Sequence, residues 1–182
     1  LTLSTLFQGA LGLLLGRMTG TDDVLFGAAV AGRPTALDGA ETIVGLFLNT
    51  VPVRVDTSAT QSLLSWLKDL HAEQTRRDEY AHASLIDLQN LTDVPKGVPF
   101  FETLLVFENY PVSIDAALSG LDLGIRLERP GGFERTNYPL SIFVHPGEEI
   151  RIEARFETDR FGESAVSRFC RHLETILDGF AS

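Results

Sequence analysis

Apolar residues recur every three or four positions near both ends of the chain, and this period predicts two long helices that each bury one face. The first pattern runs from Leu3 to Met18 and ends near Gly20. The last pattern runs from Val166 to Phe180. The core-facing positions predicted for the two helices are Leu3, Leu6, Phe7, Ala10, Leu11, Leu14 and Met18, and then Val166, Phe169, Leu173, Ile176, Leu177 and Phe180.

Two further helices are predicted in the middle of the chain. The first has a face made of Leu63, Leu67, Leu70 and Gln74, with Trp66 beside it. Ser58 or Thr60 can cap its N-terminus, because a hydroxyl oxygen accepts a hydrogen bond from a free amide of the first turn. The second helix is short, over residues 84–90, and turns Leu85 and Leu88 inward.

Extended segments are predicted between the helices. They cover residues 24–30, 43–55, 100–110, 121–127, 140–145 and 150–156. Leu104–Phe107 is a continuous apolar run, which is typical of a strand buried on both faces. Residues 121–127 alternate apolar and polar positions, as in a strand with one solvated face. Pro146–Glu149 separates the last two segments and predicts a hairpin turn.

Helices and strands therefore alternate along one globular unit. This order predicts an α/β fold over residues 1–182, a two-layer sandwich in which helices pack on a mixed β-sheet. The apolar fraction of 44% and the charged fraction of 22% are ordinary for such a domain. A chain that opens at Leu1 inside an amphipathic pattern suggests a piece of a longer polypeptide.

The composition limits the kinds of partner. A net charge of −10 without any basic run argues against nucleic acid, because phosphate binding needs clustered Lys and Arg. No apolar run is long enough to span a bilayer, and no signal peptide is visible. We therefore expect no membrane partner and a reducing, cytoplasmic location. Cys170 is the only cysteine and, on an apolar helical face, is expected to be a buried, inert thiol.

The polar residues show no complete catalytic or metal-binding motif. The histidines are His71, His82, His145 and His172, and none is adjacent to another or four residues from another. We therefore predict no metal site. His145 is expected to be solvated. His82 lies where one predicted helix ends and another begins, so its role is either capping and packing or direct function.

A second group of candidates lies in the segment 44–54. Asn49 and Thr50 follow an apolar run, and if buried they must hydrogen-bond either to neighbouring backbone or to a substrate amide in a channel. Gly45 marks either a close backbone approach or a bulge. Arg33 and Arg54 are either surface charges or ion-paired anchors for the loop between them.

Five stretches of the chain, in the same order and spacing, resemble motifs of the condensation domains of nonribosomal peptide synthetases. They are Leu3–Arg33, Val44–Arg54, Tyr80–Leu85, Phe100–Pro111 and Arg135–Leu140. The second is similar to the family pattern V-G-x-F-V-N-T-x-x-x-R, and the fourth to F-F-E-x-L-x-V-F-E-N-Y-P. The third lacks the family's acidic Gln-Asp pair, and the fifth keeps only the closing Pro-Leu.

The resemblance implies one lobe of a larger enzyme. Condensation domains have two lobes, each similar to chloramphenicol acetyltransferase, with a tunnel between them. The family's catalytic His-His-x-x-x-Asp-Gly motif belongs to the other lobe and is not in this chain. The chain is thus expected to be the C-terminal lobe, with no catalytic residue of its own and no activity alone.

The resemblance also implies the partners and the site. Substrates would arrive on the 4'-phosphopantetheine arms of donor and acceptor peptidyl carrier proteins, and the chain itself would hold no cofactor. Its other partners would be the N-terminal lobe and an adjoining adenylation domain. The expected tunnel residues are Gly45, Asn49, Thr50, His82 and Tyr138, with Arg33 and Arg54 at the floor loop. The floor maps to Gly32–Thr42, and a latch that reaches the other lobe maps to Pro111–Arg129.

Other functions remain open at this point. The same lobe would occur in an epimerization domain or an ester-forming relative, although the F-E-N-Y-P run favours condensation. A non-catalytic module that binds carrier proteins is a second class. A trimeric acyltransferase of the chloramphenicol type is a third, and the missing histidine motif weighs against it. A contiguous exposed apolar surface would distinguish a lobe from a free-standing module.

Overall fold

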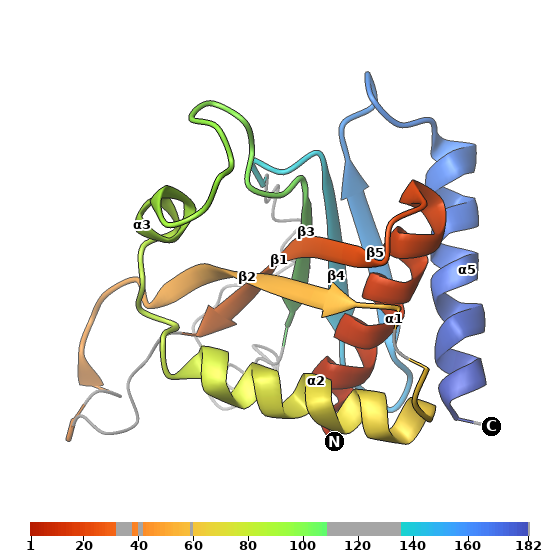
Figure 1. Cartoon of the computed structure of the whole chain (residues 1–182), viewed down its shortest axis with the longest axis horizontal. Helices are drawn as coiled ribbons and strands as arrows, with labels where there is room; N and C mark the ends of the chain where they lie inside the picture. The colour runs from red at the N-terminus through yellow and green to blue at the C-terminus, as the bar shows by residue number, and fades with distance from the viewer. Residues whose placement is uncertain (32–37, 40–41, 59, 109–135, 182) are drawn as a thin grey trace, which may run out of the picture.

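The computed structural model of the chain describes residues 1–31, 38–39, 42–58, 60–108 and 136–181 (Figure 1). Helices and strands alternate in the order that the sequence predicts. They are α1 (Leu3–Thr19), β1 (Asp23–Ala31), β2 (Leu48–Asp56), α2 (Leu63–Asp78), α3 (Leu85–Asn90), β3 (Thr103–Phe107), β4 (Leu140–His145), β5 (Arg151–Phe156) and α5 (Glu163–Phe180). The predicted strand over 121–127 lies outside the described residues, as do Arg33 and the segment 111–129.

The strands form one mixed sheet in the order β2-β1-β3-β4-β5. β1 pairs antiparallel with β2, and β4 pairs antiparallel with β5. The two inner pairings, β1 with β3 and β3 with β4, are parallel. The predicted hairpin is confirmed, because β4 and β5 pair from Leu140 with Phe156 to His145 with Arg151.

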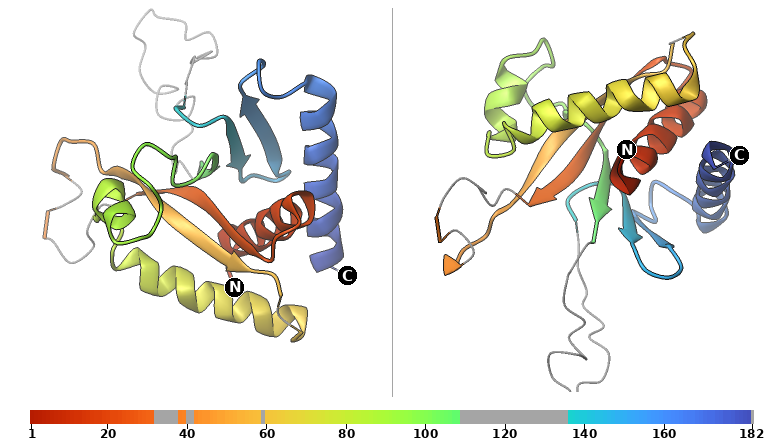
Figure 2. Two further views of the ribbon diagram at one scale, coloured as in Figure 1. Left: turned by 45° about the horizontal axis from the view of Figure 1, so that its top comes forward. Right: turned by 90° about the horizontal axis from the view of Figure 1, so that it is seen from below.

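Helices α1, α2 and α5 lie together on one side of this sheet (Figure 2). Alternate residues of each strand point to that side. The resulting core joins α1, α2 and α5 to the strands through Phe7, Leu11, Leu14, Val24, Phe26, Val51, Val53, Val55, Leu70, Leu105, Ile142, Val144, Phe169 and Leu173. The predicted two-layer α/β sandwich is therefore confirmed.

The opposite side of the sheet is organised around Gly27. A Cβ atom on Gly27 would lie 2.1 Å from a ring carbon of Phe101, so this aromatic ring rests directly on the backbone of β1. The Phe101 ring in turn stacks on Tyr138, with ring centroids 5.3 Å apart. Beside them the hydroxyl of Thr136 lies 2.6 Å from that of Ser141, which is fully buried on β4. Small and aromatic residues thus cover this side in the part described.

Helix α1 begins and ends where its sequence predicts. The Thr2 hydroxyl caps the first turn, and Gly20, with φ of 72°, ends the helix in the left-handed region that glycine favours. Met18, in the last turn of the helix, is exposed, contrary to the prediction. Gly12 allows close packing on β2, since a Cβ there would lie 2.6 Å from Val55 Cγ1.

Polar contacts also join α1 to α2, and the apolar pattern did not predict them. The Thr5 hydroxyl is fully buried and donates to Gln74 Oε1 over 2.9 Å. Arg77 Nη2 donates to Gln8 Oε1 over 2.9 Å. Buried polar groups of this kind fix one relative placement of two helices, because any shift leaves them unpaired.

The N-terminus of α2 differs from the prediction. Ser62, rather than Ser58 or Thr60, caps the helix by accepting from the Ser65 amide. Ser58 is occupied elsewhere, because its hydroxyl and its backbone N–H both donate to Asp56 Oδ1. The short helix α3 begins after Ser84, close to the predicted start at residue 84.

Two strands are shorter than predicted by several residues. β2 begins at Leu48, so Ile43–Phe47 precedes the strand instead of forming part of it. β3 covers Thr103–Phe107 within the predicted 100–110. β2 lies at the edge of the described sheet, and it carries Pro52 in its middle and the charged residues Arg54 and Asp56 near its end.

Helix α5 contains a glycine that its surroundings do not require. A Cβ on Gly179 would meet nothing within 4 Å, and its φ is not positive. We expect Gly179→Ala to stabilise the fold by about 0.5 kcal/mol, because alanine loses less backbone entropy in a helix. An unchanged or lower midpoint of urea denaturation would contradict this.

Candidate functional site

Asn49 joins the edge strand to the junction between α2 and α3. Its Nδ2 donates to the carbonyl of Ala81 over 2.7 Å and to the carbonyl of Ala83 over 2.9 Å. Its Oδ1 accepts from the backbone N–H of Thr50 over 2.9 Å. Of the two partners left open by the sequence, the observed one is backbone, and both amide hydrogens are used.

His82 lies between the two carbonyls that Asn49 binds. The turn around it is also held by hydrogen bonds from the Tyr80 amide to the Arg77 carbonyl and from the Ala83 amide to the Tyr80 carbonyl, each 2.9 Å long. The His82 side chain is exposed. Within the described ranges its imidazole has no hydrogen-bond partner, so the backbone is fixed while the side chain stays available.

Asn49 and Thr50 point to opposite sides of the sheet, because neighbouring strand residues alternate. Thr50 pairs with Ala29 and shares its side with Pro52 and Arg54, away from the helix-facing Val51. Four of the five candidate tunnel residues therefore form two groups. Asn49 and His82 lie together at the α2–α3 junction, and Thr50 belongs to the side of the sheet that carries Phe101 and Tyr138.

Tyr138 borders two small cavities beside the Phe101 stack. One has a volume of about 330 Å³ and is lined by Leu85, Gln89, Phe100, Asn137 and neighbouring residues. The other, about 310 Å³, lies toward Arg155 and Asp159. Leu85 follows the His82 turn directly, so the first cavity connects the surroundings of Tyr138 with α3.

Gly45 lies in an exposed apolar loop before β2. A Cβ there would lie 3.6 Å from a Phe47 ring carbon, which is an ordinary contact, so neither a close backbone approach nor a strand bulge explains this glycine. Its neighbours Val44 and Leu46 are 99% and 85% exposed. Ile43, Leu48, Tyr80, Ile86 and Leu91 are also exposed large apolar residues. A contiguous exposed apolar patch marks an interaction surface, whereas exposed apolar residues scattered singly are ordinary on a monomer.

Arg54 forms a bidentate ion pair with Asp23 across β1 and β2, with distances of 2.8 and 2.9 Å. Both side chains are exposed. The pair lies at the end of the strand pair where β1 begins and β2 ends. Residues 32–42 follow β1 in sequence, from the opposite end of the strand pair. Arg54 is therefore both a surface charge and ion-paired, but its partner belongs to β1.

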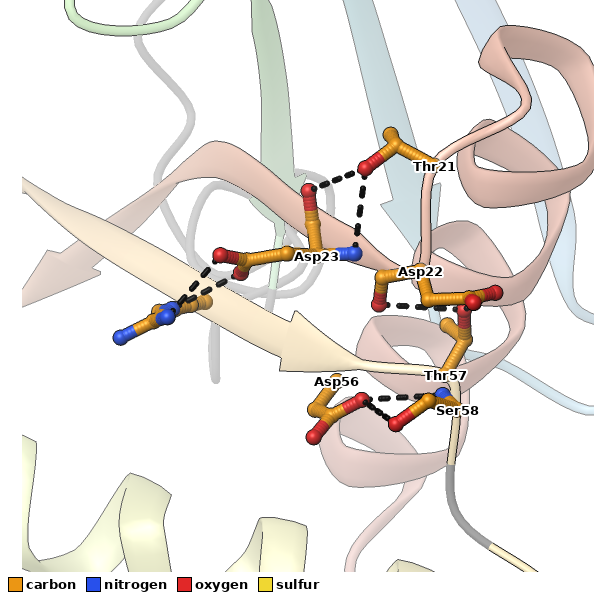
Figure 3. Close-up of polar contacts among 7 residues, drawn as sticks. Thr21, Asp22, Asp23, Asp56, Thr57 and Ser58 are labelled. Carbon is orange, nitrogen blue, oxygen red and sulfur yellow. Dashed lines mark hydrogen bonds and ion pairs between the residues drawn. The ribbon is translucent and has the colours of Figure 1, made fainter.

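The end of the β1–β2 pair carries further polar contacts. In Figure 3 Thr57 binds the carbonyl of Asp22, and Ser58 binds Asp56. A groove of about 810 Å³ runs from here along α2. Its lining residues include Asp22, Asp23, Arg54, Asp56, Trp66, Asp69, Glu73 and Arg77. No motif indicated this groove, because its walls come from segments distant in sequence.

His145 is not solvated, contrary to the sequence-based expectation. Its side chain is only 20% exposed, with Nδ1 3.2 Å from a Glu108 carboxylate oxygen and Nε2 3.6 Å from one of Glu153. Arg155 donates to Glu153 over 2.7 Å, which lowers the pKa of that carboxyl. Cys170 is half-buried, and burial raises the pKa of its thiol, in line with an inert role.

Two exposed ion pairs, Asp23 with Arg54 and Glu102 with Arg160, make the stability of the fold depend on pH. Hydrogen bonds from Arg54 hold the pKa of Asp23 below its ordinary value, and those from Arg160 do the same for the pKa of Glu102. Such groups stabilise the fold above their unfolded pKa of about 4, and the contribution is lost as pH falls through the lower folded value. We expect the urea concentration at the midpoint of unfolding to decrease as the pH is lowered from about 5 to about 3, the range in which these carboxyls titrate. A double Arg54→Gln, Arg160→Gln variant should fall less steeply, and an equal slope would contradict this.

No helix in the described part of the chain is long and apolar enough to cross a membrane. Among the same residues, no group of three His, Cys, Asp or Glu side chains is placed to hold a metal ion.

Comparison with solved structures defines the fold class. The crystal structure of holo T3CT superposes with a TM-score of 0.84 at 25% identity, covering 98% of this chain and 41% of that one. A double mutant of the starter condensation domain of rhizomide synthetase gives a TM-score of 0.73 at 19% identity, with the same coverage. The epimerization domain from the third module of tyrocidine synthetase B gives 0.66 at 18% identity, again covering 98% of this chain and 41% of that one. The predicted chloramphenicol acetyltransferase-like fold is confirmed.

Sequence relatives define the family. The condensation domain family matches residues 1–182. The chain is 40% identical over 185 residues to a linear gramicidin synthase of Brevibacillus parabrevis and 41% identical over 180 residues to a chondramide synthase of Chondromyces crocatus. It covers 4% of the length of each, while 97% and 99% of this chain is aligned. The chain belongs to the condensation domain family, as the motifs predicted.

Proposed function

We propose that the chain is the C-terminal lobe of a condensation domain in a nonribosomal peptide synthetase and forms one wall of the tunnel in which an amide bond is made. One observation carries the proposal. The chain aligns over 98% of its length with holo T3CT yet covers only 41% of that structure, at a TM-score of 0.84. This coverage supports the proposal that the chain corresponds to one part of a larger unit.

The reaction needs two reactants held side by side. The amine of an acceptor aminoacyl thioester attacks the carbonyl carbon of a donor thioester, the C–S bond breaks, the donor's pantetheine thiol is released and the amine loses a proton. Orienting two such groups supplies a large part of the rate acceleration, because the step becomes effectively unimolecular. This lobe would contribute orientation, and the proton acceptor would come from the His-His-x-x-x-Asp-Gly motif of the other lobe.

The exposed loop 42–47 and the side of the sheet with Thr50 and Tyr138 are the surfaces we assign to the missing partner and to the tunnel. Val44 and Leu46 are almost fully exposed, which favours a lobe whose counterpart covers it over a free-standing carrier-binding module. Further partners in this proposal are the donor and acceptor carrier proteins, with their phosphopantetheine-linked substrates, and an adenylation domain. The location is the cytoplasm.

The test compares this chain with the complete condensation domain that contains it, using carrier proteins loaded with aminoacyl thioesters. We expect amide product from the complete domain and none from the chain alone. Product from the chain alone, or none from the complete domain, would overturn the proposal.

The same assay distinguishes the epimerization relative, whose solved domain shares the fold. An epimerization domain would invert the α-carbon of the donor residue without forming an amide. Chiral analysis of the recovered aminoacyl group therefore separates the two functions.

A further inference from the structure

The groove of about 810 Å³ beside α2 has the dimensions of a short stretch of extended chain. One wall is the last part of the edge strand β2, and the other is α2, which contributes residues from Trp66 to Arg77. This stretch of helix spans about 16 Å, at a rise of about 1.5 Å per residue. An extended peptide of about five residues has the same length. The groove therefore suits a segment of chain better than a single ion.

The lining of the groove is acidic, with five carboxylates and two arginines. Two of the carboxylates are paired with arginine, and the other three form no ion pair among the residues that the structure describes. These three accept hydrogen bonds only from neutral side chains there, which leaves their charge available to a partner. They are Asp22, Asp56 and Asp69, whose donors are Thr57, Ser58 and Gln61.

The three carboxylates are spread along the groove instead of meeting at one point. Asp22 precedes β1, Asp56 ends β2 and Asp69 lies in α2. In the described part of the chain no three acidic, His or Cys side chains are placed to hold a metal ion. Hydrogen bonds from Ser58 hold the pKa of Asp56 below its ordinary value, so this carboxyl is ionised at neutral pH. Separated negative charges of this kind match several cations carried on one chain.

Trp66, the only tryptophan of the chain, gives the groove an aromatic wall. Its Nε1 donates to the backbone carbonyl of Asp56 over 2.8 Å. On the side of α1, a Cβ atom at Gly9 would lie 3.0 Å from a carbon of the indole ring. The ring is therefore held from the sheet and from α1 together. A fixed indole attracts lysine and arginine through its π-electrons and packs on their aliphatic stems.

Arg77 lines the groove with an unmet hydrogen-bond donor. Its Nη2 donates to Gln8, but its Nε is shielded from solvent and has no partner among the described residues. A shielded N–H without an acceptor costs free energy. Because a peptide carries a carbonyl at every residue, a bound segment can supply this acceptor when the guanidinium turns toward it.

We propose that this groove binds an extended segment of a partner protein that is rich in lysine or arginine. The carboxylates of Asp22, Asp56 and Asp69 pair with the cationic side chains of the segment, and Trp66 packs on them. None of the candidate tunnel residues lines the groove. The inference therefore goes beyond the proposed function and does not depend on it.

The test measures binding of a fluorescein-labelled peptide, Lys-Ala-Lys-Ala-Lys, to the complete condensation domain that contains this chain. Its three lysines lie on one side of an extended backbone. Fluorescence anisotropy should show saturable binding of this peptide, and no saturable binding of the same peptide with glutamate in place of lysine. Failure of the lysine peptide to bind, or equal binding of both peptides, would overturn the proposal.

The double variant Asp56→Asn, Asp69→Asn tests whether the peptide binds in this groove. Asparagine keeps an oxygen that accepts the local hydrogen bonds and removes only the charge. The Kd should rise about 5-fold, as expected for the loss of two exposed ion pairs. The matched control, Glu148→Gln with Glu149→Gln, changes the net charge equally at the exposed β4–β5 turn and should leave the Kd unchanged. Equal weakening by the two double variants would mean that the peptide is attracted only by the acidity of the whole molecule, and the proposal would be wrong.

Trp66→Leu tests the aromatic wall while the carboxylates stay in place. We expect the Kd to rise about 3-fold, the effect of losing an exposed cation–π contact. Trp66→Phe keeps an aromatic ring and should bind the peptide more tightly than Trp66→Leu does. If the double aspartate variant does not fold, the two single variants take its place. Wild-type affinity in Trp66→Leu would contradict the placement of the segment in this groove.

Discussion

Gly27→Val is expected to destabilise the fold by about 3 kcal/mol or more, the upper end of what overpacking costs. Valine normally suits a central strand. Here, however, its Cβ would have to occupy space 2.1 Å from a ring carbon of Phe101, and that ring is buried and stacked on Tyr138. Neither the strand nor the ring can move without disturbing the sheet. The free energy of unfolding, measured by urea denaturation, tests this.

Two further variants identify the cause. Phe101→Ala removes the ring that the new methyl groups would meet, so the double variant should lose less stability than the sum of the two single ones. Gly45→Val is the matched control, because a Cβ at Gly45 makes only an ordinary contact, and it should change stability by less than about 0.5 kcal/mol. Additive losses in the double variant would show that the clash is not the reason.

Leu173→Ala is expected to cost about 3 kcal/mol, within the range of about 2–5 kcal/mol for a buried leucine. Leu173 is 0% exposed, on the face of α5 that packs on the core. Truncation leaves a cavity between α5, α1 and the sheet that rigid neighbours on three sides cannot fill. Thermal or urea unfolding measures the loss.

Leu91→Ala provides the comparison at an exposed leucine. Leu91 is 84% exposed, so its removal should change the stability of the isolated chain by less than about 0.5 kcal/mol. If Leu173→Ala lowered the free energy of unfolding no more than Leu91→Ala does, the placement of Leu173 and α5 in the core would be wrong.

The elements of the fold were predictable because their signals are local. Periodic apolar positions indicated α1, α2 and α5, and the turn at Pro146–Glu149 indicated the β4–β5 hairpin. The start of β2 was wrong by five residues, since Ile43–Phe47 has the composition of a strand but no strand beside it in the described residues. Apolar composition alone does not distinguish a strand from an exposed loop.

The contacts of the candidate site were less predictable because they join distant segments. Asn49 finds its partners 32 and 34 residues later in sequence. His145 lies beside Glu108, which only the parallel pairing of β3 and β4 brings close. Motif resemblance indicated which residues to consider and correctly placed the chain in its family. It gave no information on which side of the sheet each residue would point to.

The placement of Pro52 on β2 has a consequence for how copies of this molecule behave at high concentration. A foreign strand that tried to extend the sheet there would meet a residue without an N–H and, near it, the charges of Arg54 and Asp56. The growth of fibrils by addition of strands along β2 is therefore disfavoured. We expect any aggregation of the isolated chain to proceed through the exposed apolar residues Val44 and Leu46, and to be reduced by polar substitutions at those two positions.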